Sequence, residues 1–324
     1  MVKVRRGYRS KNVRVTGSTG GGRGGGIRIP QSRGGKAGAG VGGAGLLGVI
    51  VVVVISLIGG GGGLDLGSLG LDGQAGLGGS SGMGADDLPD ISDADLEEWS
   101  ATFDDIQNTW IDIFEAAGLE YRISTLTIFN GSTSTGGCGN APAEVGPFYC
   151  PADDGVYFDP AFFRELTERF GAPGDFAISY VLAHEIGHHI QNLTGVSSQV
   201  REQQQGAIES ERNALTIRLE LQADCLAGIW AFEATQRPRT FEGNDNILYL
   251  ERGDLEEGLR AAEAVGDDNI QETMGGQVNP HDWTHGSSAQ REAWLTLGLE
   301  TGDPSACNDT FDPSVPATEI MPTR

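Results

Sequence analysis

The chain has 324 residues, of which 38% are hydrophobic, and carries a formal net charge of −23. Residues 1–36 contain ten Lys and Arg and no acid, so the other 12 basic residues face all 45 acidic ones, and the chain beyond Lys36 carries −33. A body this acidic repels nucleic acid and anionic lipid head groups, which argues against a polyanionic partner.

Residues 1–36 are rich in Arg, Gly and Ser and lack apolar periodicity, so we expect a basic, disordered leader. An uncharged apolar run of 18 residues follows at 41–58 (VGGAGLLGVIVVVVISLI). As a helix it would be about 27 Å long, close to the thickness of the hydrocarbon core of a bilayer. We therefore predict a single transmembrane helix within residues 37–63. The positive-inside rule then places the leader in the cytoplasm and the acidic body outside the cell membrane.

The apolar run at 41–58 has two other possible interpretations besides a membrane anchor. A cleaved signal peptide would have a shorter charged region and a small-residue cleavage site, whereas here a long leader precedes the run and poly-Gly follows it. A buried strand is disfavoured by the Gly-rich flanks. Residues 64–90 are predicted to be a Gly-rich flexible linker, 91–312 the folded domain and 313–324 a C-terminal tail.

The folded domain reads as α+β, mainly helical with a small antiparallel sheet. Apolar residues at helical spacing predict helices at about 92–117, 160–170, 174–193, 206–235, 254–265 and from 287 onward. Residues 122–129 (RISTLTIF) alternate as a strand, and 155–158 (GVYF) predict a second one. The strand from Ile123 to Phe129, or that from Val156 to Phe158, is expected to form the sheet edge that pairs with an extended peptide.

Four cysteines lie in the domain, and none belongs to a C-x-x-C pair. Outside the cytoplasm they would form two disulfides. Cys138 and Cys150 enclose a short Gly- and Pro-rich loop and are predicted to pair locally, which leaves Cys225 for Cys307.

The helix predicted at 174–193 carries H-E-x-x-H as His184, Glu185 and His188. A spacing of four places both imidazoles on one helix face, where they can share a metal ion. Two histidines and one further ligand leave the fourth position of a tetrahedral Zn²⁺ open for water, and Glu185 can take the proton of that water. The pattern therefore predicts a zinc hydrolase.

A second element, E-x-x-x-D, lies 32 residues beyond His188 on another predicted helix. Glu220 can supply the third zinc ligand, and Asp224 can accept the free N–H of a ligand imidazole and so orient it. Acid-rich helices often contain such pairs by chance, but the neighbours of this pair are unusually apolar for a solvated face.

The remaining histidines are His189, His281 and His285. The oxyanion formed during peptide hydrolysis needs a hydrogen-bond donor, and His285 is the candidate, with His281 as the alternative. A surface-loop histidine without a function is an equally simple reading of either. His189 points away from the ligand face and is interpreted as structural.

Four segments together resemble a known family: HEIGHHIQNLTG, ELQADCLAGIW, GPFYCPADDGVYFDP and THGSSAQREAW. They occur in the order typical of the neutral zinc metallopeptidase family of membrane-anchored bacterial proteins, and the resemblance covers about residues 92–312. It implies a gluzincin-like fold, Zn²⁺ held by His184, His188 and Glu220, and Glu185 as the base. The basic leader lies outside the resembling part, and the resemblance implies no particular substrate.

These observations predict a membrane-anchored zinc peptidase acting on a peptide or protein. The alternative is a non-catalytic, zinc-stabilised binding or scaffold domain of the cell envelope. Glu185 speaks against that alternative, because a purely structural zinc site requires no base.

Overall fold

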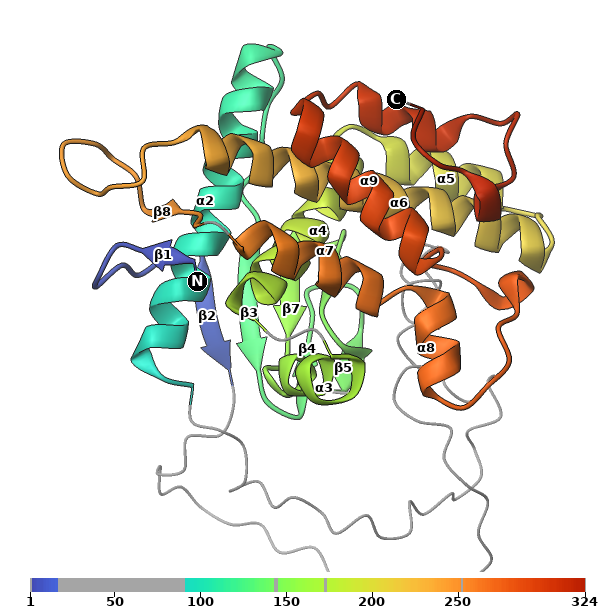
Figure 1. Cartoon of the computed structure of the whole chain (residues 1–324), viewed down its shortest axis with the longest axis horizontal. Helices are drawn as coiled ribbons and strands as arrows, with labels where there is room; N and C mark the ends of the chain where they lie inside the picture. Colours follow the sequence, from blue (N-terminus) through green and yellow to red (C-terminus); the bar gives the residue numbers. More distant parts are fainter. Residues whose placement is uncertain (1, 17–90, 143–144, 172–173, 252, 324) are drawn as a thin grey trace, which may run out of the picture.

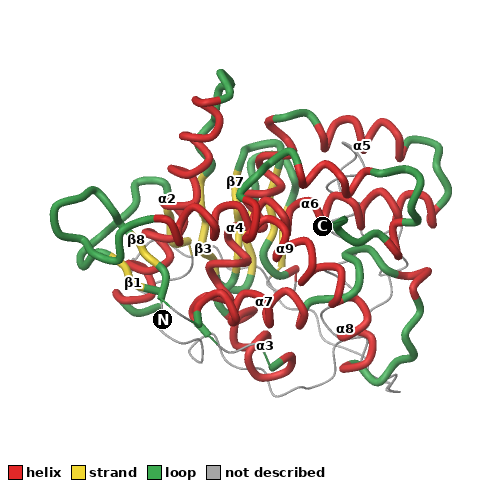
Figure 2. The backbone as a smooth tube through the Cα atoms, turned by 45° about the horizontal axis from the view of Figure 1, so that its top comes forward, coloured by secondary structure: helices red, strands yellow, loops and turns green. Residues whose placement is uncertain are grey.

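The computed structural model describes residues 2–16, 91–142, 145–171, 174–251 and 253–323. Helices surround a small sheet, as the two views in Figures 1 and 2 show. The predicted transmembrane segment at 37–63 and the linker at 64–90 lie outside the described residues. Within the described part of the chain, no helix is long and apolar enough to cross a membrane.

The first long helix, α2 (Asp93–Ala116), begins at a capping box in which Ser92 and Asp95 satisfy each other's backbone N–H groups. Its predicted apolar stripe is buried against the sheet and the neighbouring helices. The stripe includes Trp99, Phe103, Ile106, Trp110 and Phe114. Trp99 meets Phe158 of the sheet edge-on, with ring centroids 5.2 Å apart. Helical packing thus accounts for the aromatic residues of α2.

The main sheet has four strands in the order β2 (Val13–Thr16), β3 (Thr125–Phe129), β7 (Gly155–Phe158) and β6 (Phe148–Cys150). β2 and β7 run parallel to β3, whereas β6 runs antiparallel to β7. The sheet is therefore mixed, and the prediction of an antiparallel sheet was wrong. The predicted edge strands were also wrong, because β3 and β7 are interior and β2 and β6 form the two edges.

Three helices form the centre of the domain: α4 (Asp175–Leu193), α6 (Glu209–Gln236) and α9 (Ser288–Thr301). α6 and α9 cross at a pair of glycines, since a Cβ on Gly228 would collide with the Leu295 carbonyl oxygen and one on Gly298 with that of Cys225. Close helix contact of this kind fixes α6, and with it any side chain that α6 presents to α4.

The other elements are shorter. The polar stretch at 196–204, for which no helix was predicted, forms α5. Around the centre lie α3 (Ala161–Phe170), α5 (Val196–Gln204), α7 (Asp254–Ala264), α8 (Asp267–Thr273) and the 3-10 helices η3 (Pro280–Asp282), η4 (Ala306–Phe311) and η5 (Ala317–Glu319). The small strands are β1 (Lys3–Val4) with β8 (Leu248–Tyr249), and β4 (Ser132–Ser134) with β5 (Asn140–Pro142).

Both ends of the chain pack on the domain more closely than the sequence predicted. Residues 2–16 contain β1 and β2, so the prediction of disorder was wrong for this part of the leader. At the other end, Gln290 Nε2 donates hydrogen bonds to the carbonyl oxygens of Ala317 and Ile320 at 2.8 and 3.0 Å. Residues 313–323 are thus tied to α9 and do not form a separate tail.

Both predicted disulfides are present. Cys138 pairs with Cys150 at the sheet edge, and Cys225 of α6 pairs with Cys307 of η4. The second bridge links residues 82 positions apart and fastens the C-terminal region to the central helix.

Candidate metal centre

His184 and His188 project from one face of α4 toward Glu220 of α6. His184 Nε2 lies 3.1 Å from Glu220 Oε2, and His188 Nε2 lies 3.4 Å from Glu220 Oε1. One potential ligand atom from each residue fits within 4.8 Å of the other two. The two segments that the sequence singled out therefore meet at one point.

A glycine between the two histidines permits this approach. A Cβ on Gly187 would lie 2.9 Å from the Ala223 carbonyl oxygen and 3.0 Å from its Cα. Any larger residue at position 187 would push α4 and α6 apart. The glycine in HEIGH therefore sets the distance between the histidines and Glu220.

Hydrogen bonds fix how both imidazoles are oriented. His184 Nδ1 lies 2.8 Å from Asp224 Oδ1, and His188 Nδ1 lies 2.9 Å from Gln191 Oε1. A carboxylate and an amide oxygen only accept hydrogen bonds, so each Nδ1 must carry a proton. Nε2 is then the nitrogen that each ring directs at Glu220, and it offers a lone pair to a metal ion once its own proton is displaced.

The Nε2 atoms of His184 and His188 and the Glu220 carboxylate face one another and together form a site that fits a cation. Glu220 is 2% exposed, and its Oε1 makes no hydrogen bond within the described part of the chain. Two imidazoles and one carboxylate are a ligand set typical of catalytic zinc sites, which keep a fourth position for water. His184, His188 and Glu220 therefore fit Zn²⁺.

The pKa shifts of His184 and Glu220 also indicate that the site favours positive charge. Burial alone would lower the pKa of His184, but the charge and hydrogen bond of Asp224 outweigh it and raise the pKa to about 10. Burial would raise the pKa of Glu220, yet the facing His188 and His184 hold it well below its usual range. The site thus favours positive charge between these residues, which a metal ion would supply.

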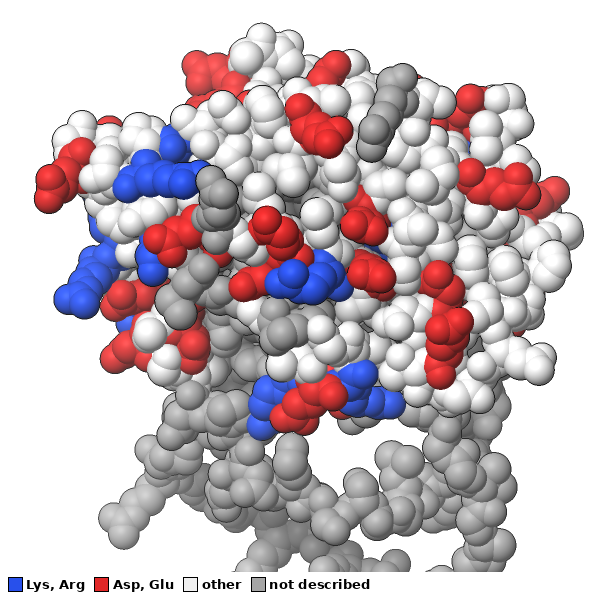
Figure 3. All heavy atoms as spheres, viewed as in Figure 1, with Lys and Arg blue, Asp and Glu red and all other residues white. Residues whose placement is uncertain are grey.

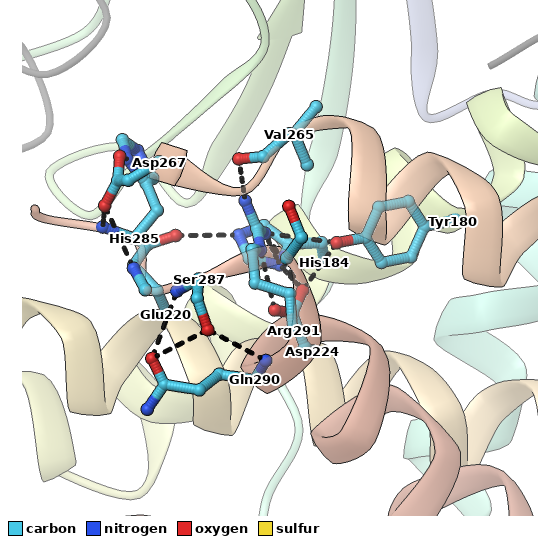
Figure 4. Close-up of polar contacts among 12 residues, drawn as sticks. Tyr180, His184, Glu220, Asp224, Val265, Asp267, His285, Ser287, Gln290 and Arg291 are labelled. Atoms are coloured by element: carbon cyan, nitrogen blue, oxygen red, sulfur yellow. Dashed lines mark hydrogen bonds and ion pairs between the residues drawn. The ribbon is translucent and has the colours of Figure 1, made fainter. Parts of the chain in front are cut away.

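Asp224 is the centre of a buried polar network (Figure 4). Besides the His184 imidazole, its carboxylate accepts hydrogen bonds from the Tyr180 hydroxyl at 2.6 Å and from Arg291 Nε at 2.8 Å. Arg291 Nη1 also donates to the Val265 carbonyl oxygen at 3.2 Å. Because every group is paired, the Asp224 carboxylate holds the His184 ring rigidly.

Glu185 lines the same cavity as the two histidines and is 7% exposed. Burial raises the pKa of its carboxyl group, although the neighbouring His188 and His184 counteract this. Apolar side chains from several elements form much of the remaining wall. They are Pro147, Phe148, Pro151, Phe162, Val181, Leu219, Val265 and Ile270.

His285 also lines this cavity, whereas His281 does not contribute to its wall. His281 is exposed in η3. His285 is buried, and its Nδ1 lies 3.1 Å from Asp267 Oδ1 (Figure 4). Of the two candidates, only His285 is placed where it can reach a molecule held in the cavity.

His189 faces away from the cavity, as the sequence suggested. Its Nδ1 lies 2.9 Å from the Tyr149 hydroxyl, and its Nε2 lies 2.6 Å from the Arg122 carbonyl oxygen. Both ring nitrogens therefore link α4 to the sheet region.

Sequence reasoning missed four residues that support the centre: Tyr180, Gln191, Asp267 and Arg291. Gln191 stands three residues after His188, so a search for a polar residue one helical turn beyond the motif could have found it. Arg291 lies within the THGSSAQREAW segment that carried the resemblance. Tyr180 stands four residues before His184 and so offered the same signal. Asp267 had none.

The candidate ligand set is that of a zinc-metallopeptidase-like protein. Residues 2–311 match the profile of the family described as "Putative neutral zinc metallopeptidase", and the chain belongs to this family. The match begins at residue 2, so the leader is not outside the family pattern as the resemblance had suggested.

Relatives occur in distant bacteria. "Uncharacterized protein YpfJ" of Escherichia coli (strain K12) is 46% identical over 209 residues, which cover 64% of this chain and 69% of that protein. "Uncharacterized protein Rv2575" of Mycobacterium tuberculosis (strain ATCC 25618 / H37Rv) is 48% identical over 192 residues, covering 59% of this chain and 63% of that protein. No solved structure matches the chain.

Proposed function

We propose that the protein is a zinc-dependent peptidase that hydrolyses peptide bonds with water activated at this centre. The observation that carries the proposal is the convergence of His184, His188 and Glu220 in a cavity that Glu185 also lines. A structural zinc site is closed by four protein ligands and needs no base beside it.

His184, His188 and Glu220 would hold the ion. Bound there, Zn²⁺ would polarise the substrate carbonyl and lower the pKa of a water molecule. Glu185 takes the proton from that water and passes it to the nitrogen of the leaving amine. Burial would lower the pKa of His285, but the charge and hydrogen bond of Asp267 outweigh it and raise the pKa. The protonated ring can then donate a hydrogen bond from Nε2 to the developing oxyanion of the substrate.

The cavity wall supports an extended peptide with an apolar side chain as substrate. β6 is an edge strand, paired with β7 on one side, and its residues Phe148 and Tyr149 line the cavity. An edge strand can bind a peptide by backbone hydrogen bonds, while the apolar wall accepts a side chain. β6 therefore replaces β3 and β7 as the proposed binding strand.

The test compares the full chain with its Glu185→Gln variant. Each is assayed for bound metal by elemental analysis and for cleavage of a peptide library by mass spectrometry. We expect both to bind about one zinc per chain and only the wild type to cleave, with apolar residues enriched next to the cut. Equal cleavage by both proteins would refute Glu185 as the base. Zinc binding without cleavage by either would favour the non-catalytic scaffold.

A further inference from the structure

Residues 2–16, here called the N-terminal arm, are an integral part of the peptidase fold. β1 pairs antiparallel with β8, with Lys3 opposite Tyr249. β2 adds a parallel strand to β3, with Arg14 opposite Thr127. Figure 1 shows the arm lying along α2 and the edge of the sheet. The arm thus completes two sheets whose other strands come from the domain.

The side chains of the arm make specific contacts with the domain. The Asp104 carboxylate of α2 accepts hydrogen bonds from the Tyr8 hydroxyl at 2.7 Å, Ser10 Oγ at 2.8 Å and Asn12 Nδ2 at 3.0 Å. Val2 is 4% exposed and belongs to the main hydrophobic core. Three hydrogen bonds to one carboxylate and a buried anchor indicate a folded element with a defined register.

The charge of the arm is complementary to the domain. Arg9 Nη2 lies 2.8 Å from Asp93, and Lys3 Nζ lies 3.4 Å from Glu251. On the face shown in Figure 3, the basic side chains at the left lie close to acidic ones, and further basic side chains lie at the centre and along the lower edge. Lys3 and Arg9 therefore have acidic partners in the fold itself. These pairs offer a second explanation for basic residues near the N-terminus, besides retention in the cytoplasm.

These contacts have a topological consequence. Strands can pair only within one compartment, because a bilayer between them would break every backbone hydrogen bond of the pair. We infer that residues 2–16 lie on the same side of the cell membrane as residues 91–323. A chain that crossed the membrane once between these two parts could not form the β1–β8 and β2–β3 pairs.

The two disulfides indicate on which side of the membrane the domain lies. Cys138–Cys150 connects β6 to the loop before it, and Cys225–Cys307 connects α6 to η4. Disulfides persist outside the reducing cytoplasm. The N-terminal arm is therefore extracytoplasmic together with the catalytic centre. This inference is independent of whether the centre cleaves peptides.

The first experiment measures accessibility in intact cells. Single cysteines are introduced into the full chain at two exposed positions, Arg6→Cys in the arm and Asp245→Cys in the domain, and treated with a membrane-impermeant maleimide. We expect both variants to react in intact cells to the same extent as after lysis. Reaction of the Asp245→Cys variant alone would overturn the inference, and so would protection of both.

The second experiment tests strand pairing directly. The double variant Arg14→Cys/Thr127→Cys places two thiols on paired positions of β2 and β3. With free thiols blocked before lysis, we expect an intramolecular crosslink. The control pair Arg14→Cys/Glu292→Cys joins β2 to α9, which lie apart in Figures 1 and 2, and should not crosslink. No crosslink in the first pair, in a chain that still binds zinc, would overturn the docked arm.

Discussion

Asp267 binds both the side chain and the backbone of the segment that carries His285. Its Oδ1 lies 3.1 Å from His285 Nδ1, and its Oδ2 accepts the backbone N–H groups of Thr284, His285 and Gly286 at 2.7, 2.6 and 3.0 Å. One carboxylate thus fixes both the ring and the loop, so that His285 Nε2 is the nitrogen left for a ligand. Asp267 is a positioning residue in the mechanism proposed above.

This relationship predicts a non-additive pair of variants. His285→Ala should lower kcat by about 10²-fold to 10³-fold, the usual effect of losing an oxyanion donor. Asp267→Asn should cause a smaller loss, because the ring remains but is less well held. The double variant should be no slower than His285→Ala alone. Additive losses, measured on the same peptide with zinc content unchanged, would show that Asp267 acts independently of His285.

Gln191 should control metal affinity through His188. Its Oε1 faces His188 Nδ1, while its Nε2 donates to the Leu219 carbonyl oxygen at 2.7 Å. Gln191→Leu removes the acceptor and should weaken zinc binding about 10-fold to 100-fold. Competition with a chromophoric chelator measures this affinity.

The matched variant for that experiment is Gln191→Glu. It keeps an acceptor for His188 but cannot donate to Leu219. We expect its zinc affinity to stay closer to the wild type than that of Gln191→Leu, with a loss of stability to urea instead. Equal zinc affinities in the two variants would contradict the role of the His188 hydrogen bond.

Gly187→Ala tests the close approach of α4 and α6. Alanine favours a helix by about 1 kcal/mol over glycine, so a freely exposed helix would be stabilised. Here the added Cβ meets the backbone of Ala223, and we expect instead a loss of about 1–3 kcal/mol and weaker zinc binding. Adding Ala223→Gly removes the Cβ at 3.1 Å but leaves the closer carbonyl oxygen and Cα, so it should restore neither property fully. Urea unfolding with and without zinc measures both effects.

The convergence of the candidate ligands could be predicted because its signals are local. His184 with His188, and Glu220 with Asp224, are each four residues apart on one helix, and helical geometry makes such residues neighbours. The two pairs could be expected to meet once both helices, α4 and α6, were predicted to be buried. Arg291 and Asp267 reach the centre from α9 and α8, and no short spacing links them to the motif.

The N-terminal arm and the sheet were harder to predict because their partners are distant in sequence. Val13–Thr16 is a four-residue strand in a basic, Gly-rich context, and its partner β3 begins at Thr125. Composition suggested disorder, since the arm alone cannot bury enough apolar surface. The same limit applies to strand order, because β7 follows β6 directly in the chain but also pairs with the distant β3, which leaves β6 at the edge.

The final prediction concerns acid stability and the Asp154 carboxylate. The backbone of Asp154 has a positive φ of 53°. Its carboxylate accepts hydrogen bonds from Arg122 Nε at 2.9 Å and from the Tyr149 hydroxyl at 2.8 Å. Burial would raise the pKa of this carboxyl group, but the bonds from Arg122 and Tyr149 outweigh it and lower the pKa. Its folded-state pKa therefore lies below the unfolded value, which is about 3.9. The group stabilises the fold above that pH and loses this effect as the pH falls further.

Asp154→Asn should remove this pH dependence, and asparagine tolerates the left-handed backbone. At pH 7 we expect a loss of about 1 kcal/mol in the free energy of unfolding, since Arg122 is more than half exposed and solvent screens the pair. Below about pH 4 the difference from the wild type should shrink toward zero. Urea unfolding of the full chain at pH 7, 4 and 3 measures it. Asp245→Asn, in an exposed loop, removes the same charge as a control. If the Asp154→Asn difference were the same at all three pH values, its cause would be packing and not the carboxylate charge.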